Sequence, residues 1–181
     1  MHELAIKVPL IGKKPLGPIH SLICDRKGRV YLSDEINHRV LCLTEEGKIL
    51  WWQGPDSEDP IQLHYPRGLA LGRISTENAG LADCLAVCDS WNNRVVFLSP
   101  ASGQIGEWRM AGDLPLREVS DIRYMENHWI LLDRGNQRLC WLGLDGQLLT
   151  QVGQPSGSKM EPDSKYPVFE FMAEKYAPPI P

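Results

Sequence analysis

Apolar and polar residues form short alternating runs along most of the chain, and turn-forming residues separate them. Runs of Val, Ile, Leu and Trp are bounded by Gly, Asp, Asn and Pro, which is typical of short strands joined by tight turns. No long stretch has apolar residues at the 3.6-residue period of a helix. The pattern therefore predicts an all-β chain with few helices.

One polar pattern occurs three times. The segment "SDEINHRVLCL" recurs as "CDSWNNRVVFL" and as "LDRGNQRLCWL", and a glycine turn follows each copy. The shared pattern is Asp-x-x-Asn-x-Arg followed by apolar residues. Its members are Asp34, Asn37 and Arg39, then Asp89, Asn92 and Arg94, then Asp133, Asn136 and Arg138. This self-similarity indicates a repeat architecture.

Each copy predicts four antiparallel strands, and the copies occupy residues 18–54, 66–112 and 119–153. The expected strands are "SLIC", "RVYLSD", "RVLCL" and "KILWWQG", then "RGLALG", "CLAVCD", "RVVFLS" and "QIGEWRM", then "SDIRYM", "WILLD", "RLCWLG" and "QLLTQVG". Residues 1–17 are expected to form an N-terminal strand and a linker. Residues 154–181 are expected to form a polar linker and an extended tail.

The repeated polar residues have an expected structural role. The Asp at the end of the second strand can accept backbone N–H bonds from the turn that follows, and the Asn tolerates a left-handed conformation. The Arg can reach the carboxylate or the carbonyls of a neighbouring turn. Because the triad recurs in every copy, we interpret it as part of the repeat's framework and not as a catalytic triad.

The repeat can be compared with a known family. Asp-x-x-Asn-x-Arg between two hydrophobic strands, with "YPRGLALG" before the second copy, resembles the NHL repeat over about residues 18–153. The third copy lacks the Pro-x-Gly start, and the first has His20 where the second has Gly68. NHL repeats build β-propellers, usually with six four-stranded blades. The resemblance therefore implies a half-propeller of three blades.

Three blades do not close a ring, since propellers typically contain four to eight. The outer faces of the first and last blades would then leave apolar surface exposed to water. We therefore expect association. A second copy related by a twofold axis would give a 3 + 3 ring, or a different chain would supply the missing blades. A third possibility is an arc that is capped by its termini and packs on a larger complex.

Composition and charge narrow the function classes. The net charge of −4 and the pI of about 5.7 argue against RNA binding, which some NHL propellers perform. No secretory leader and no run of 18 apolar residues is present, so we expect no membrane span. The five cysteines form no CxxC pair, and we expect all five to be reduced and in or near the core. These features together predict a cytoplasmic location.

Some residues could carry chemistry. His20, His64 and Asp121 lie near the starts of the first strands, whose loops face one end of the propeller channel. Resemblance to propeller lyases and lactonases implies metal ligands around that channel. The positions judged equivalent hold His20, Gly68 and Val119, which are too few ligands for zinc or calcium. The sequence thus predicts no catalytic residue, no metal and no cofactor, with His38 as a plain turn residue.

Other residues are candidates for contacting a partner. Trp51 and Trp52 fall on opposite faces of one strand, so at most one of them packs between blades. Trp91 lies in a turn, where an aromatic ring suits an interface. We take Trp91, Trp52, His20 and His64 as candidate partner-binding residues. The sequence favours a non-catalytic protein-binding or assembly module, and the alternative is a lyase- or lactonase-type enzyme whose site forms on oligomerisation.

Overall fold

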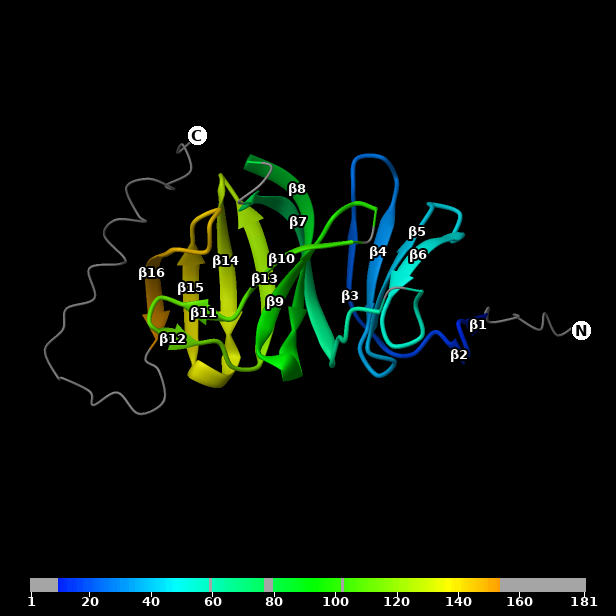
Figure 1. Cartoon of the computed structure of the whole chain (residues 1–181), viewed down its shortest axis with the longest axis horizontal. Coiled ribbons are helices and arrows are strands. Elements are labelled where there is room, and N and C mark those ends of the chain that lie inside the picture. Colours follow the sequence, from blue (N-terminus) through cyan, green and yellow to red (C-terminus); the bar gives the residue numbers. More distant parts are fainter. Residues whose placement is uncertain (1–9, 59, 77–79, 102, 154–181) are drawn as a thin grey trace, which may run out of the picture.

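The computed structural model describes residues 10–58, 60–76, 80–101 and 103–153 of the 181-residue chain. It contains three four-stranded antiparallel sheets that follow one another along the chain (Figure 1). We call them blades 1, 2 and 3. In each blade, strands that are consecutive in sequence are neighbours in the sheet. The predicted all-β class with four-stranded antiparallel blades is confirmed.

The observed strands lie where the apolar runs predict them. Blade 1 consists of β3 (Ile19–Cys24), β4 (Val30–Asp34), β5 (Arg39–Leu43) and β6 (Ile49–Gln53). Blade 2 consists of β7 (Pro66–Thr76), β8 (Gly80–Asp89), β9 (Arg94–Leu98) and β10 (Gln104–Trp108). Blade 3 consists of β13 (Val119–Met125), β14 (His128–Asp133), β15 (Arg138–Leu142) and β16 (Leu148–Gly153).

Short elements connect the blades. A two-stranded hairpin precedes blade 1, β1 (Leu10–Ile11) with β2 (Lys14–Pro15), and another precedes blade 3, β11 (Met110–Ala111) with β12 (Leu114–Pro115). A single 3₁₀ turn follows the motif Asp in blades 2 and 3, η1 (Ser90–Asn92) and η2 (Arg134–Asn136). We call the end of the molecule with these turns the turn end. The opposite end, with the β3–β4, β7–β8 and β13–β14 hairpins, is the hairpin end.

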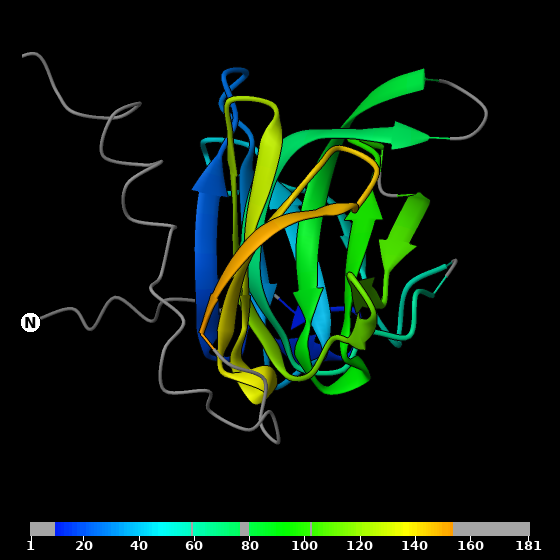
Figure 2. The ribbon, with the colours of Figure 1, turned by 90° about the vertical axis from the view of Figure 1, so that its left-hand side faces the viewer.

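The blades pack face to face, and the first strands β3, β7 and β13 lie side by side (Figures 1 and 2). One apolar cluster joins blades 1 and 2 through Tyr31, Val40, Leu69 and Leu85. A second joins blades 2 and 3 and includes Trp129, which is fully buried. Each blade therefore contributes alternate residues of its strands to a shared core.

Burial differs sharply between the middle blade and blade 3. Every residue of β9 from Val95 to Leu98 is fully buried, because both faces of blade 2 are covered. In β14 and β15, buried residues alternate with partly exposed ones. The partly exposed set on this outer face includes Leu132, whose residue surface is 41% exposed, together with Ile130, Leu139 and Trp141. Blade 3 thus presents an apolar face that no described residue covers in full.

The cysteines are all free thiols, as expected. Cys42, Cys84, Cys88 and Cys140 are buried, but Cys24 is exposed at the end of β3. The expectation of a near-core position is wrong for Cys24, because it alternates onto the outer side of blade 1. Within the described residues, no helix is long and apolar enough to cross a membrane. Of the predicted N-terminal strand and linker, residues 10–17 are described and contain the β1–β2 hairpin; residues 1–9 and the predicted tail lie outside the described residues.

Candidate functional site

The motif Asp of each blade anchors the segment that enters that blade. Each of these carboxylates is fully buried and accepts a backbone N–H bond from that segment. The pairs are Gly17 to Asp34 at 3.1 Å, His64 to Asp89 at 2.6 Å and Arg117 to Asp133 at 2.8 Å. The motif Asn donates to the same carboxylate and to a carbonyl of the entering segment, at Pro15, Gln62 and Pro115 respectively.

The motif Arg completes this anchor. Its Nε donates to the motif carboxylate at 2.7–2.8 Å in all three blades. Its other nitrogens donate to carbonyls of the entering segment, which are Ile11 and Pro15, Gln62, and Ala111 and Leu114 in the three blades. In blades 2 and 3, Nη1 also donates to a side chain of the fourth strand, Glu107 and Gln151 respectively. A buried guanidinium needs such a full set of acceptors. The geometry is that of a framework, repeated three times.

Two details of the predicted turn are wrong. The carboxylate takes its main N–H bonds from the segment before the blade, and only Asn37 N–H, at 3.4 Å, comes from the turn that follows. The left-handed residue is the one after the Asn: His38, Asn93 and Gln137 have φ of 57°, 54° and 55°. The Asn is needed for its side-chain donors and not for its backbone freedom.

The left-handed residues also link neighbouring blades. His38 of blade 1 accepts the N–H of Tyr65 on its Nδ1 at 3.2 Å, and Asn93 of blade 2 accepts the N–H of Glu118 on its Oδ1 at 2.8 Å. Tyr65 and Glu118 themselves have positive φ, 53° and 45°. We call this bond the inter-blade latch. His38 is therefore more than the plain turn residue that the sequence predicts.

Two of the predicted partner-binding residues meet at the turn end. His64 and Trp91 are in edge contact, with ring centroids 5.2 Å apart. Tyr65 stacks on Trp91 at 4.5 Å, and His38 contacts both Tyr65 and His64. Trp91 is 56% exposed. We call His38, His64, Tyr65 and Trp91 the aromatic shelf.

The other two predicted partner-binding residues lie elsewhere. Trp52 packs with Leu32 and Leu41 on the outer face of blade 1, and its buried Nε1 has no acceptor among the described residues. Trp51 faces blade 2 and donates to the carbonyl of Pro100 at 3.1 Å. His20 is exposed on β3, with its Nδ1 3.8 Å from Glu35, which also binds Arg67.

The strand register corrects the predicted equivalence of His20, Gly68 and Val119. Ile19, Pro66 and Val119 each pair with the motif Asp of their own blade. His20 therefore corresponds to Arg67 and Ser120, and Gly68 corresponds to Ser21 and Asp121. The single-residue bulge that follows the first residue of each first strand hides this register in the sequence. Asp121 forms an exposed ion pair with Arg123.

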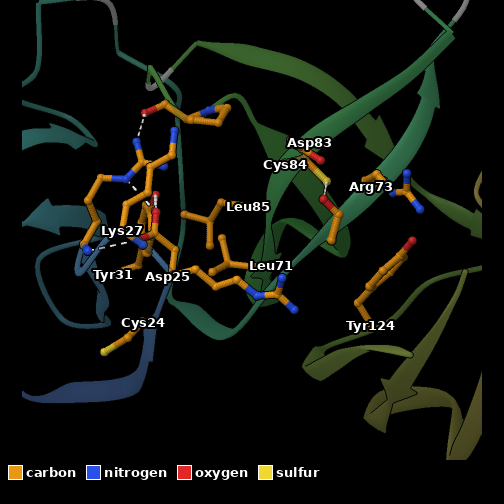
Figure 3. A pocket seen from close by; sticks show the side chains of 14 residues that line it. Cys24, Asp25, Lys27, Tyr31, Leu71, Arg73, Asp83, Cys84, Leu85 and Tyr124 are labelled. Atoms are coloured by element: carbon orange, nitrogen blue, oxygen red, sulfur yellow. Dashed lines mark hydrogen bonds and ion pairs between the residues drawn. The ribbon is translucent and has the colours of Figure 1, made fainter. Parts of the chain in front are cut away.

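A cavity of about 720 Å³ opens at the hairpin end between blades 1 and 2. Figure 3 shows Asp25 and Tyr31 on its blade 1 side, with Arg73 and Tyr124 across from them. Leu71 and Leu85 form an apolar part of the wall. The charged lining residues are Arg26, Lys27, Arg29 and Arg73 against Asp25 and Asp83.

The charges of this cavity are partly neutralised within it. Asp25 accepts from Arg29 Nε at 2.6 Å, from the Tyr31 hydroxyl at 3.2 Å and from the N–H groups of Lys27 and Arg29. Burial opposes ionisation of Asp25, but these bonds outweigh it and lower its pKa. Burial raises the pKa of Tyr31 strongly. The remaining charge is positive, which suits an anionic ligand and not a cation.

The thiols and acids of the described residues do not form a nucleophilic or metal-binding group. Burial raises the pKa of Cys84 to about 12 and that of Cys140 to about 11, so both are protonated at neutral pH. Cys84 donates to the carbonyl of Gly72. In the described part of the chain, no three His, Cys, Asp or Glu side chains converge as metal ligands would.

Sequence reasoning missed Tyr65 and the cavity residues. Tyr65 directly precedes the Pro of the "YPRGLALG" segment, and only its left-handed conformation, which is unusual for an aromatic residue, turns its ring toward Trp91. Residues Asp25, Arg26, Lys27 and Arg29 form an ordinary polar hairpin in the sequence. Nothing in the local pattern indicates that this hairpin faces β7 of the next blade.

The sequence matches no protein-family model and no curated protein sequence. Solved structures do match the fold. Streptogramin B lyase and the virginiamycin B lyase from Staphylococcus aureus each align with a TM-score of 0.53, 15% identity and 77% of this chain. The WD40 domain of Neurospora crassa Pan2 aligns with a TM-score of 0.51 and 14% identity, also over 77% of this chain.

In its described part, the chain has the fold of β-propeller blades. It spans 41%, 42% and 38% of these three structures, which is less than half of each. At these identities the likeness concerns the fold alone. Because lyases and a WD40 domain share the fold, the fold does not separate an enzyme from a binding module.

Proposed function

We propose that the chain is a non-catalytic assembly module whose three NHL-like blades pair with those of a second copy. The observation that carries the proposal is the contrast between β9, buried on both faces, and β14 and β15, buried on one. A blade is built to be covered on both sides, since its stability comes largely from its neighbours.

The outer face of blade 1 offers a matching surface. Leu22 is 60% exposed there, beside the cluster of Leu32, Leu41 and Trp52. Blade 3 of one copy would cover blade 1 of the other, and a twofold axis would repeat the same junction. This gives a ring of six blades. At about 25 cal/mol per Å² of apolar surface, covering several hundred Å² at each junction stabilises the pair by about 10 kcal/mol or more before association costs.

The mass of the native particle tests this proposal. Light scattering at micromolar concentration should give about twice the 20.4 kDa chain mass. A monodisperse 20.4 kDa species with a sharp thermal transition would contradict it. If the chain were purified from its native source only in complex with a different protein, that protein would be the one that supplies the missing blades.

The lyase- or lactonase-type alternative has one supporting observation, the cavity at the hairpin end. Three polar side chains that line this cavity, Lys27, Arg73 and Tyr124, could orient an anionic substrate. Elemental analysis of the purified particle separates the two functions. A metal present in stoichiometric amount, which is released when the particle dissociates into single chains, would favour an enzyme whose site forms on assembly.

A further inference from the structure

The aromatic shelf is not required by the repeat. The residues that correspond to Trp91 are Ile36 in blade 1 and Gly135 in blade 3, and the anchor of each blade forms without an aromatic ring there. The residue that corresponds to Tyr65 is Pro18 in blade 1 and Glu118 in blade 3. The shelf is thus special to the junction of blades 1 and 2.

The shelf is also held rigidly by backbone bonds. His64 N–H donates to the buried Asp89, and Trp91 N–H donates to the carbonyl of His64 at 3.1 Å. Tyr65 is fixed in its left-handed conformation by the latch to His38. A preformed surface loses little conformational entropy when a ligand binds. Glu118 has the same left-handed backbone and the same latch, so the conformation belongs to the repeat, and only the aromatic side chain at this position is particular to the junction of blades 1 and 2.

The chemistry of the shelf fits a proline-rich ligand. Polyproline II helices dock against surfaces lined by aromatic rings in several domain families, because the extended helix is preformed and loses little conformational entropy on binding. The imidazole rings of His38 and His64 flank the stacked pair. The four shelf residues include no carboxylate, ammonium or guanidinium group, so the shelf offers a ligand mainly apolar and ring contacts.

The chain carries such a ligand. Residues 176–181 read Tyr-Ala-Pro-Pro-Ile-Pro, with three prolines in six residues, and they lie outside the described residues. Strand β16 ends at Gly153, which pairs with Arg138 beside η2, so the chain leaves blade 3 at the turn end. Trp91, in η1, lies at this same end. The 22 residues 154–175 can span up to about 70 Å at about 3.3 Å per residue. The path from blade 3 to the junction of blades 1 and 2 crosses at most two sheet spacings of about 10 Å each, so the linker is long enough.

We propose that the aromatic shelf binds a proline-rich segment in the polyproline II conformation, and that residues 176–181 of the same chain are its occupant. The shelf is a different surface from the outer blade faces, so this proposal does not rest on the assembly proposed above.

Peptide binding to a truncated chain tests the proposal. The chain that ends at residue 175 should bind the synthetic peptide Tyr-Ala-Pro-Pro-Ile-Pro in calorimetric titration. The same peptide with its three prolines replaced by Ala should bind at least tenfold more weakly. Trp91→Ile, which installs the residue of blade 1, should also weaken binding at least tenfold. Met110→Ala removes an exposed apolar side chain on β11 and should leave binding unchanged.

The full chain shows whether its own tail is the occupant. A tethered ligand has an effective concentration in the millimolar range, so for a dissociation constant of about 100 μM the added peptide should bind about tenfold more weakly than to the truncated chain. This weakening should not depend on protein concentration. Equal binding to both chains would overturn the tail as occupant, and a concentration-dependent weakening would assign the tail of a second copy instead.

Failure to bind, or binding that Trp91→Ile does not change, would overturn the shelf as a site. Thermal melts of each variant confirm that it is folded, and Trp91→Ile is expected to fold because other blades place Ile or Gly at this position. The native mass measured in parallel keeps the two proposals separate, because Trp91→Ile should not alter it.

Discussion

At the scale of single residues, the motif carboxylates should differ in their contribution to stability. Asp133 is the only acid that contacts Arg138 among the described residues, and Arg138 is 2% exposed. Arg94 also contacts Glu107 at 2.7 Å, so it keeps a counter-ion when Asp89 is removed. We predict that Asp133→Ala lowers the free energy of unfolding by about 3–5 kcal/mol and Asp89→Ala by about 1–3 kcal/mol.

Urea unfolding at a fixed protein concentration measures both values. Asp121→Ala is the control, because Asp121 and Arg123 form an exposed pair that contributes little. Equal effects of all three substitutions would contradict the framework role of the motif Asp.

His38 should make stability depend on pH. Burial lowers the pKa of His38 below its ordinary value of 6.5, and the charges of His64 and Lys14 lower it further, although Glu35 and Asp89 oppose them. Because the folded-state pKa is the lower one, the unfolded chain binds more protons, and stability falls as pH drops below about 6.5. Protonation also removes the Nδ1 acceptor of the latch to Tyr65.

We predict that His38→Asn reduces the loss of unfolding free energy between pH 8 and pH 5.5. Asn is the matched replacement, since Asn93 performs the same latch in blade 2 and tolerates a left-handed backbone. Urea unfolding of both proteins at the two pH values measures the difference. Identical pH dependence would show that other groups dominate the titration.

At the scale of elements, the sequence predicts the positions of the strands but not their register or the contacts between strands of neighbouring blades. Apolar runs and turn residues locate the strands of all three blades because local alternation reflects burial directly. The same pattern does not reveal the bulges in β3, β7 and β13. Comparison of the repeats by sequence therefore pairs His20 with Gly68, although they occupy different positions in the strand register. The sequence also predicts Trp91 and His64 as contact residues but not that a left-handed Tyr65 joins them, since long-range packing fixes that conformation.

The close packing of β7 against β13 explains why the first glycine of "YPRGLALG", Gly68, has no side chain. A Cβ on Gly68 would lie 2.6 Å from the Cα of Asp121 in β13, and backbone cannot yield as a side chain can. We predict that Gly68→Ala destabilises the chain by about 1–3 kcal/mol through overpacking of β7 against β13. Gly106→Ala, whose Cβ would lie 3.2 Å from the flexible end of Ile74, should cost less in the same denaturation experiment.

At the scale of the whole molecule, the latch distinguishes the junctions within the chain from the proposed junction between copies. Tyr65 and Glu118 donate their N–H groups to the preceding blade. Pro18 occupies the corresponding position before blade 1, and proline has no N–H to donate. A blade that docks against blade 1 therefore cannot form this bond. The junction between copies should be the weaker one.

This asymmetry predicts two-step unfolding. Dilution or mild urea should first separate the copies in a concentration-dependent step, and the three blades should then unfold in a step that does not depend on concentration. Leu132→Asp places a charge on the outer face of blade 3, where the residue is 41% exposed. It should abolish the first step and leave the second nearly unchanged, because an exposed site tolerates a charge in the separated chain. Loss of the second step instead would mean that Leu132 supports the blade itself and that its outer face is not a junction.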